Sequence, residues 1–127
     1  MTLKNRILLL PEQVNNNEHL LWRGRHLSTK LLVQVGTEDY LVHIQKGQIL
    51  DVKQGPFVMP SWQFALRAEE QAWVEFWRPL PPPGYNDLLA MVKAKRLRIE
   101  GDLFPFMSNL LYFKDLFASI RLSEGAP

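Results

Sequence analysis

The sequence predicts a single α+β domain over residues 1–127, with a five-stranded, mainly antiparallel sheet and helices packed on one of its faces. Short segments in which apolar and polar residues alternate predict the strands. Segments with apolar residues three and four positions apart predict the helices. A chain of 127 residues can bury a substantial core, but it is too short for separate cofactor and substrate domains. One binding site is therefore expected.

Three strands open the predicted sheet, at Lys30–Val35, Tyr40–Gln45 and Gln48–Lys53. The turns between them are short, which predicts an antiparallel meander. Alternation assigns one face to the core. That face holds Leu31, Val33, Val35, Tyr40, Val42, Ile44, Leu50 and Val52. The opposite face is mostly polar and is expected to be solvated.

A fourth strand, Trp62–Arg67, continues the alternation and leads into a predicted helix over Ala68–Trp77. Pro79 ends this helix because proline lacks the amide that the next turn requires. The connector Pro79–Gly84 is stiff and non-helical. A second helix is predicted over Tyr85–Lys95, with Asn86 as its cap.

The last quarter of the chain is its most informative part. A strand over Leu97–Glu100 is followed by Gly101 and by Asp102, which is placed to cap a long helix, Leu103–Ile120. At about 100° per residue, the apolar residues of this helix cover roughly two thirds of its circumference. They are Leu103, Phe104, Phe106, Met107, Leu110, Leu111, Phe113, Leu116, Phe117 and Ile120. One sheet would cover only about half a helix, so an apolar ligand, a second subunit or a membrane surface should cover the rest.

The first thirty residues carry weaker patterns. Leu3–Leu10 predicts a short helix, Asn15–Asn17 a turn and Leu20–Trp22 an apolar anchor. The apolar run Ile7–Leu10 is too short for a signal-peptide core or a membrane span.

Composition narrows the function classes. The chain has no cysteine, which excludes disulfides, thiolate metal sites and a cysteine nucleophile, and which is compatible with a cytoplasmic location. The net charge of +2 is small, and the basic residues are not interleaved with aromatic ones, so nucleic-acid binding is not expected.

The order of elements and two local sequences, YLVHIQKGQI and RLRIEGD, resemble the sterol carrier protein type-2 family over about residues 29–121. The resemblance implies helices that enclose an apolar tunnel above a five-stranded sheet, and a domain that carries sterols, fatty acids or acyl-CoA. The connector PLPPPG and Ala68 depart from the family pattern. These departures concern the ligand and the size of the pocket more than the fold.

Two apolar groups are candidates for the walls of that cavity. In the last helix, Phe106, Leu110, Phe113 and Phe117 are assigned to the sheet side, and Phe104, Met107 and Leu111 to the other flank. The second group is Trp73, Phe76, Trp77 and Met91. Aromatic and methionine side chains suit a ligand without polar handles. Ordinary core packing together with a dimer interface explains the same residues.

One dense basic cluster, Lys93, Lys95, Arg96 and Arg98, is a candidate for contact with a carboxylate, a phosphate or an anionic lipid headgroup. A solvated strand face is the alternative interpretation. Arg23 and Arg25, which flank Gly24, form a weaker candidate of the same kind.

Enzymatic motifs are missing from the sequence. The three histidines form no metal-binding pattern, and the sequence has no phosphate-binding loop and no nucleophile elbow. The sequence therefore predicts non-catalytic binding or transfer of a fatty acid, acyl-CoA, sterol-like lipid or isoprenoid quinone, with no cofactor and no metal. The alternative is a homodimeric or accessory module that docks on a partner enzyme of lipid metabolism through its last helix, with transient membrane contact also considered.

Overall fold

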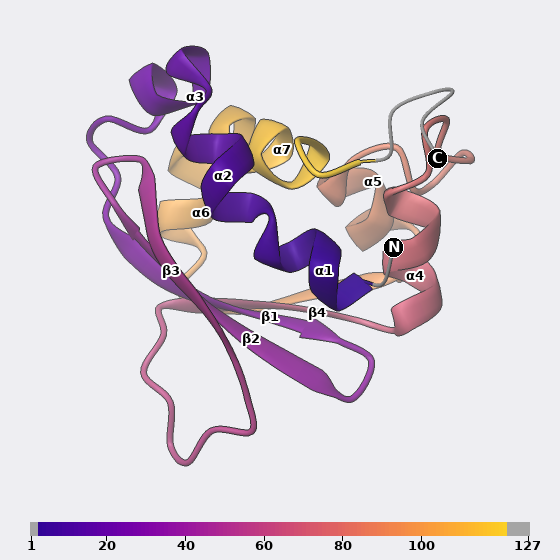
Figure 1. Cartoon of the computed structure of the whole chain (residues 1–127). Coiled ribbons are helices and arrows are strands. Elements are labelled where there is room, and N and C mark those ends of the chain that lie inside the picture. The colour runs from indigo at the N-terminus through magenta and orange to yellow at the C-terminus, as the bar shows by residue number, and fades with distance from the viewer. Residues whose placement is uncertain (1–2, 122–127) are drawn as a thin grey trace.

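The computed structural model describes residues 3–121 and has the predicted α+β architecture (Figure 1). The strands are β1 Thr29–Val35, β2 Glu38–Gln45, β3 Gln48–Gln54, β4 Phe64–Ala68 and β5 Leu97–Gly101. They form one sheet in the order β3-β2-β1-β4-β5. Strands β1 and β4 are parallel, and the other neighbours are antiparallel. The sheet is therefore mixed, and the fold class that the sequence predicts is confirmed.

Seven helices are described, and Figure 1 shows them gathered on one face of the sheet. They are α1 Leu3–Leu8, α2 Leu10–Asn15, α3 Glu18–Arg23, α4 Glu70–Phe76, α5 Leu88–Lys93, α6 Phe104–Ser108 and α7 Leu110–Ala118. The sheet face beneath them carries the apolar set predicted from the alternation, except at Leu50. Leu50 is exposed and Ile49 is buried in its place. The cause is a shift in register between β2 and β3, where His43 pairs with Asp51 and Ile44 with Ile49, so Leu50 has no partner.

Several helix boundaries differ from the prediction. Helix α4 starts at Glu70 because Ala68 still pairs with Leu97 in the sheet. Helix α5 starts at Leu88, and its cap is Asp87, whose Oδ1 accepts from the Ala90 amide at 2.9 Å, instead of Asn86. The Leu20–Trp22 anchor lies within α3, where Leu20 is buried and Trp22 is exposed.

The last helix is broken in two at Asn109, where a continuous helix was predicted. The Asn109 backbone has φ −126° and ψ 35°, and its side-chain amide donates to the Pro105 carbonyl at 3.0 Å. A side chain that bonds to the backbone one turn earlier competes with helix continuation. The N-cap position of α6 is Leu103 instead of the predicted Asp102, but the Asp102 side chain still accepts from the Phe104 amide at 3.1 Å.

The core between sheet and helices is rich in aromatic side chains. Phe64 of β4 packs edge-on against Phe106 and Phe113, with ring centroids 5.7 and 5.3 Å away. Trp73 stacks on Trp77 at 5.0 Å. Such pairs add to the stability gained by burying apolar surface.

Three hydrogen bonds from distant segments hold the C-terminal helix in place. The Tyr112 hydroxyl donates to the Gly47 carbonyl at 2.7 Å, and the Trp77 indole donates to the Phe117 carbonyl at 2.9 Å. The buried Arg6 donates to the Ile120 carbonyl at 2.7 Å. We call these three bonds the α7 clamp.

The Gly47 end of the clamp depends on close backbone contact. A Cβ at Gly47 would lie 2.8 Å from the Gly24 carbonyl oxygen, and its φ of +80° favours glycine in any case. The β2–β3 turn, the end of α3 and the Tyr112 ring therefore meet at one point.

The first prediction concerns Tyr112→Phe, which removes the donor from a buried carbonyl. We expect the free energy of unfolding at pH 7, measured by chemical denaturation, to fall by about 1–2 kcal/mol. Burial raises the pKa of the Tyr112 phenol above its ordinary value of 10.0. The unfolded chain releases this proton near pH 10 and the folded chain keeps it, so stability is fully present below pH 10 and is lost as the pH rises above it. That loss should be smaller in Tyr112→Phe, and an equal loss in both proteins would contradict it.

Candidate functional site

An exposed apolar face runs along α6 and the start of α7. It consists of Leu103, Phe104, Met107 and Leu111, of which Phe104 is 75% and Leu111 58% exposed. Exposed apolar residues are common singly, but four within nine positions indicate a surface that meets something other than water. We call these four residues the α6–α7 face.

A groove of about 320 Å³ lies where α6 and α7 separate. Met107, Leu110 and Leu111 line it together with Trp22 of α3, so the structure brings together three of the residues predicted to bind a ligand. Trp22 was missed as a site residue because no pattern in the sequence places α3 beside the last helix. The other lining residues are Arg23, Ser108, Asn109 and Tyr112.

Of the remaining predicted ligand residues, Phe104 is exposed on the α6–α7 face outside the groove, and the other five lie in the interior. Trp73, Phe76, Trp77, Met91 and Phe106 are each at most 1% exposed. A side chain that bordered an internal space large enough for water would have accessible surface, so side chains fill this part of the core. A ligand that enters between the sheet and the helices has to displace some of them. Their ligand-binding roles remain predictions.

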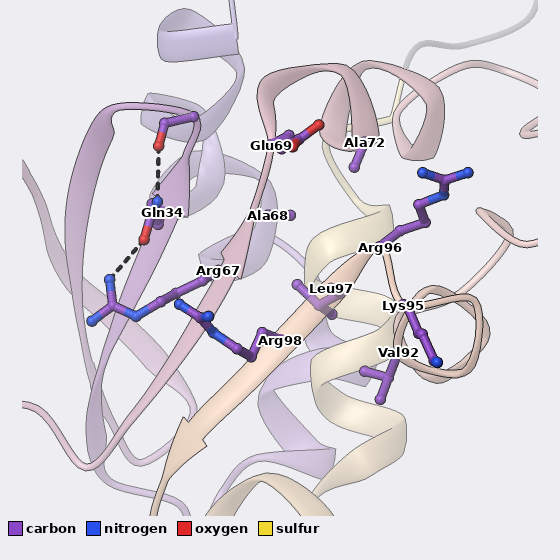
Figure 2. Close-up of a pocket in the computed structure, with 11 residues that line it drawn as sticks. Gln34, Arg67, Ala68, Glu69, Ala72, Val92, Lys95, Arg96, Leu97 and Arg98 are labelled. Atoms are coloured by element: carbon purple, nitrogen blue, oxygen red, sulfur yellow. Dashed lines mark hydrogen bonds between the residues drawn. The ribbon is translucent and has the colours of Figure 1, made fainter.

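The basic residues lie around a second pocket, of about 530 Å³, at the start of β5 (Figure 2). Lys95, Arg96 and Arg98 line it, whereas Lys93 does not. Arg67 of β4 and Gln34 of β1 join them. The sequence did not indicate Arg67, because only the pairing of β1 with β4 and of β4 with β5 places Gln34, Arg67 and Arg98 in one row across three strands.

Glu100 organises two of these cations. Its Oε1 accepts from Arg67 Nε at 2.6 Å, and its Oε2 forms an ion pair with Arg98 Nε at 2.8 Å. Arg67 also donates from Nη1 to Gln34 Oε1 at 2.7 Å. One carboxylate thus holds two guanidinium groups on the same sheet face.

The weaker basic candidate, Arg23 and Arg25, is arranged differently. The Arg25 guanidinium lies over the Trp22 ring, 3.9 Å from its centroid, and donates to the Trp22 carbonyl. Arg23 donates to His19 and lies 3.9 Å from Asp115. Arg23 also lines the groove, whereas Arg25 does not line it and contacts the lining residue Trp22.

Within residues 3–121, no cluster of His, Asp and Glu is arranged to hold a metal ion. In the same part of the chain, no helix has the length and apolar content needed to cross a bilayer.

Comparison with solved structures decides the fold. A crystal structure of sterol carrier protein 2 superposes with a TM-score of 0.75 at 12% sequence identity, over 94% of this chain and 95% of the other. The fold is that of sterol carrier protein 2. The sequence itself matches no model of a protein family and is significantly similar to no curated protein.

Two other structures with the sterol carrier protein 2 fold are of similar size to this chain. A conserved hypothetical protein of Thermus thermophilus, considered a possible sterol carrier protein, gives a TM-score of 0.69 at 11% identity, over 94% of this chain and 89% of that one. A ubiquinone synthesis protein, UbiJ-SCP2, gives 0.58 at 16% identity, over 92% of each chain.

The same fold also occurs inside a larger enzyme. The sec-alkyl sulfatase PisA1 matches with a TM-score of 0.64 at 11% identity, over 88% of this chain but only 16% of its own length. Sterol carrier protein 2 folds are therefore found both alone and as part of enzymes.

The second prediction tests whether the last two helices have one structural and one exposed side. Phe113→Ala, which empties a fully buried position between Phe64 and Phe106, should lower the free energy of unfolding by about 3–5 kcal/mol. Leu111→Asp on the α6–α7 face should change it by less than about 0.5 kcal/mol. Urea denaturation of both variants measures the free energy of unfolding. Similar decreases in the two variants would mean that Leu111 is part of the core.

Proposed function

We propose that this chain binds and carries a hydrophobic ligand without catalysis, and that the ligand enters at the groove between α6 and α7. The α6–α7 face carries the proposal, since an apolar surface there leads directly to the apolar core. On the other side of the same short segments, Phe106 and Phe113 are buried against Phe64 of the sheet. Displacing these two helices from the sheet would open an apolar space.

The size of the hydrophobic effect sets a lower limit on the ligand. Burying ten methylene groups is worth about 8 kcal/mol. That energy corresponds to a Kd of about 1 µM before the cost of moving core side chains is subtracted. A fatty acid, an acyl-CoA, a sterol-like lipid and an isoprenoid quinone are all large enough, whereas a short-chain metabolite is not.

We also propose, from the lack of cysteine, that the chain binds its ligand in the cytoplasm.

The break between α6 and α7 supports entry of the ligand at this groove. The Asn109 interruption leaves α6 with only five residues, and helices this short gain little stability of their own. Displacing α6 therefore sacrifices mainly its packing contacts, and those are apolar contacts that a lipid can replace.

The second candidate function is docking on a partner enzyme of lipid metabolism, or self-association, through the same α6–α7 face. Its specific support is that Phe104 is 75% exposed and does not line the groove. The similarity to UbiJ-SCP2, described as a ubiquinone synthesis protein, is compatible with an accessory role beside such an enzyme.

The third prediction separates these functions. Delipidated protein titrated with a fluorescent fatty acid and a fluorescent sterol should show saturable binding of at least one probe. The double variant Met107→Asp, Leu111→Asp should bind at least about tenfold more weakly, since each change places a charge in the groove. Leu80→Asp, at an exposed apolar position outside the face, is the matched control and should bind as the wild type does.

Light scattering on the same proteins tests the second candidate function, docking or self-association. A wild-type dimer that dissociates in Phe104→Asp while probe binding persists would make the face an interface. A well-folded sample with no saturable probe binding would overturn the carrier function.

A further inference from the structure

The basic pocket and the α6–α7 groove lie at opposite ends of the sheet. The groove contains Tyr112, which bonds to Gly47 at the β2–β3 turn. The basic pocket includes Gly36, at the β1–β2 turn. The eight residues of β2 separate these turns, which corresponds to about 25 Å. The basic pocket is therefore not the mouth of that groove and needs its own explanation.

The pocket carries a surplus of positive charge. Arg67, Lys95, Arg96 and Arg98 line it, and Glu69 is the one carboxylate in the lining. Glu100 pairs with Arg67 and Arg98, and Asp39 and Glu70 lie beside the lining residues Gln34 and Gly36. Counted over the lining residues and Glu100 alone, four cations face two carboxylates, so two positive charges remain. A phosphate monoester carries close to two negative charges at neutral pH, whereas a carboxylate carries one. The charge balance favours a phosphate.

The arrangement of the cations leaves their donors available. Glu100 meets Arg67 and Arg98 at their Nε atoms, and a guanidinium has four further N–H donors on its terminal nitrogens. Gln34 accepts one of these from Arg67, which leaves three on Arg67 and four on Arg98. Within residues 3–121, Lys95 and Arg96 make no salt bridge and no side-chain hydrogen bond. Figure 2 shows Arg67 and Arg98 on one flank of the pocket and Lys95 and Arg96 on the other.

The floor between these flanks is small and apolar. Ala68, Ala72 and Leu97 form it and are themselves buried. Alanine side chains end at Cβ, so they leave room for the uncharged part of a ligand. A volume of about 530 Å³ is in the range of small-molecule sites.

We propose that this pocket is a second binding site of the chain, for molecules that present a phosphate group beside an apolar or flat part. The two flanks bind the phosphate oxygens and the alanine floor receives the remainder. The phosphate belongs either to a soluble metabolite or to a phospholipid headgroup. This site is independent of the proposed hydrophobic-ligand function.

Lys95 offers an unusually clean variant for testing the site. It follows the end of α5 in the left-handed conformation, with φ +61°, while the Arg96 amide donates to the Met91 carbonyl at 2.8 Å. Glycine is the residue preferred at this place after a helix. Lys95→Gly thus removes the charge and keeps or improves the local backbone. We expect the free energy of unfolding of this variant to match that of the wild type, which separates a loss of binding from misfolding.

The fourth prediction is that pyrophosphate binds to the wild-type protein saturably and with one-to-one stoichiometry by isothermal titration calorimetry at low salt. Lys95→Gly and Arg98→Gln should each weaken binding by about tenfold. Lys93→Gln, which removes a neighbouring charge that does not line the pocket, should change it less than about twofold. Equal losses in all three variants would reduce the effect to general surface charge and overturn the site.

Vesicles distinguish the two sources of phosphate. Binding to phosphatidic acid vesicles that requires Arg98 and Lys95, without pyrophosphate binding, assigns the site to a lipid headgroup. Absence of both kinds of binding overturns the proposal. Fatty-acid and sterol titrations should be unchanged in Lys95→Gly, so this test and that of the hydrophobic-ligand function fail separately.

Discussion

The attachment of the last two helices to the sheet is the constraint on which the rest of the structure depends. Short helices such as α6 and α7 are unstable alone and persist because they bury apolar side chains. Phe106, Phe113 and Phe117 supply that burial. The α7 clamp then fixes position and direction, because its three bonds come from α1, the end of α4 and the β2–β3 turn.

The α7 clamp holds the C-terminal part of residues 103–120, whereas the N-terminal part depends mainly on packing. All three clamp bonds act on residues 112–120, whereas α6 is held by its packing and by the Asp102 and Asn109 side chains. A segment held at one end can be displaced at the other without breaking buried polar contacts. This difference explains why the apolar surplus gathers around the α6–α7 break and why a ligand route is proposed there.

Local patterns in the sequence predicted much of the fold. The alternation at Leu31, Val33 and Val35 correctly predicted that these residues are buried. Helical spacing alone placed the buried Phe106 and the exposed Met107 on different sides of their helix. The break at Asn109 and the bulge at Leu50 were missed, because each is a choice between nearly equal local structures that tertiary packing decides. The predicted helix of Leu3–Leu10 became α1 and the start of α2, interrupted at Leu9.

The candidate sites were predictable only in part, for the same reason. Lys95, Arg96 and Arg98 are neighbours in sequence and were found together, whereas Arg67 joins them only through the order of strands in the sheet. Trp22 joins Met107 and Leu111 only because α3 packs near α7. Contacts between distant segments depend on topology, and a single sequence carries little information about topology beyond the resemblance to a known fold.

Hydrogen exchange followed by mass spectrometry tests the central claim most directly, because it reports which backbone segment a ligand affects. Delipidated protein should exchange faster over residues 103–111 than over β1 and β2, and an added long-chain fatty acid should slow exchange in that segment more than elsewhere. Protection that is already equal to that of the central strands, with no change when the fatty acid is added, would contradict the account.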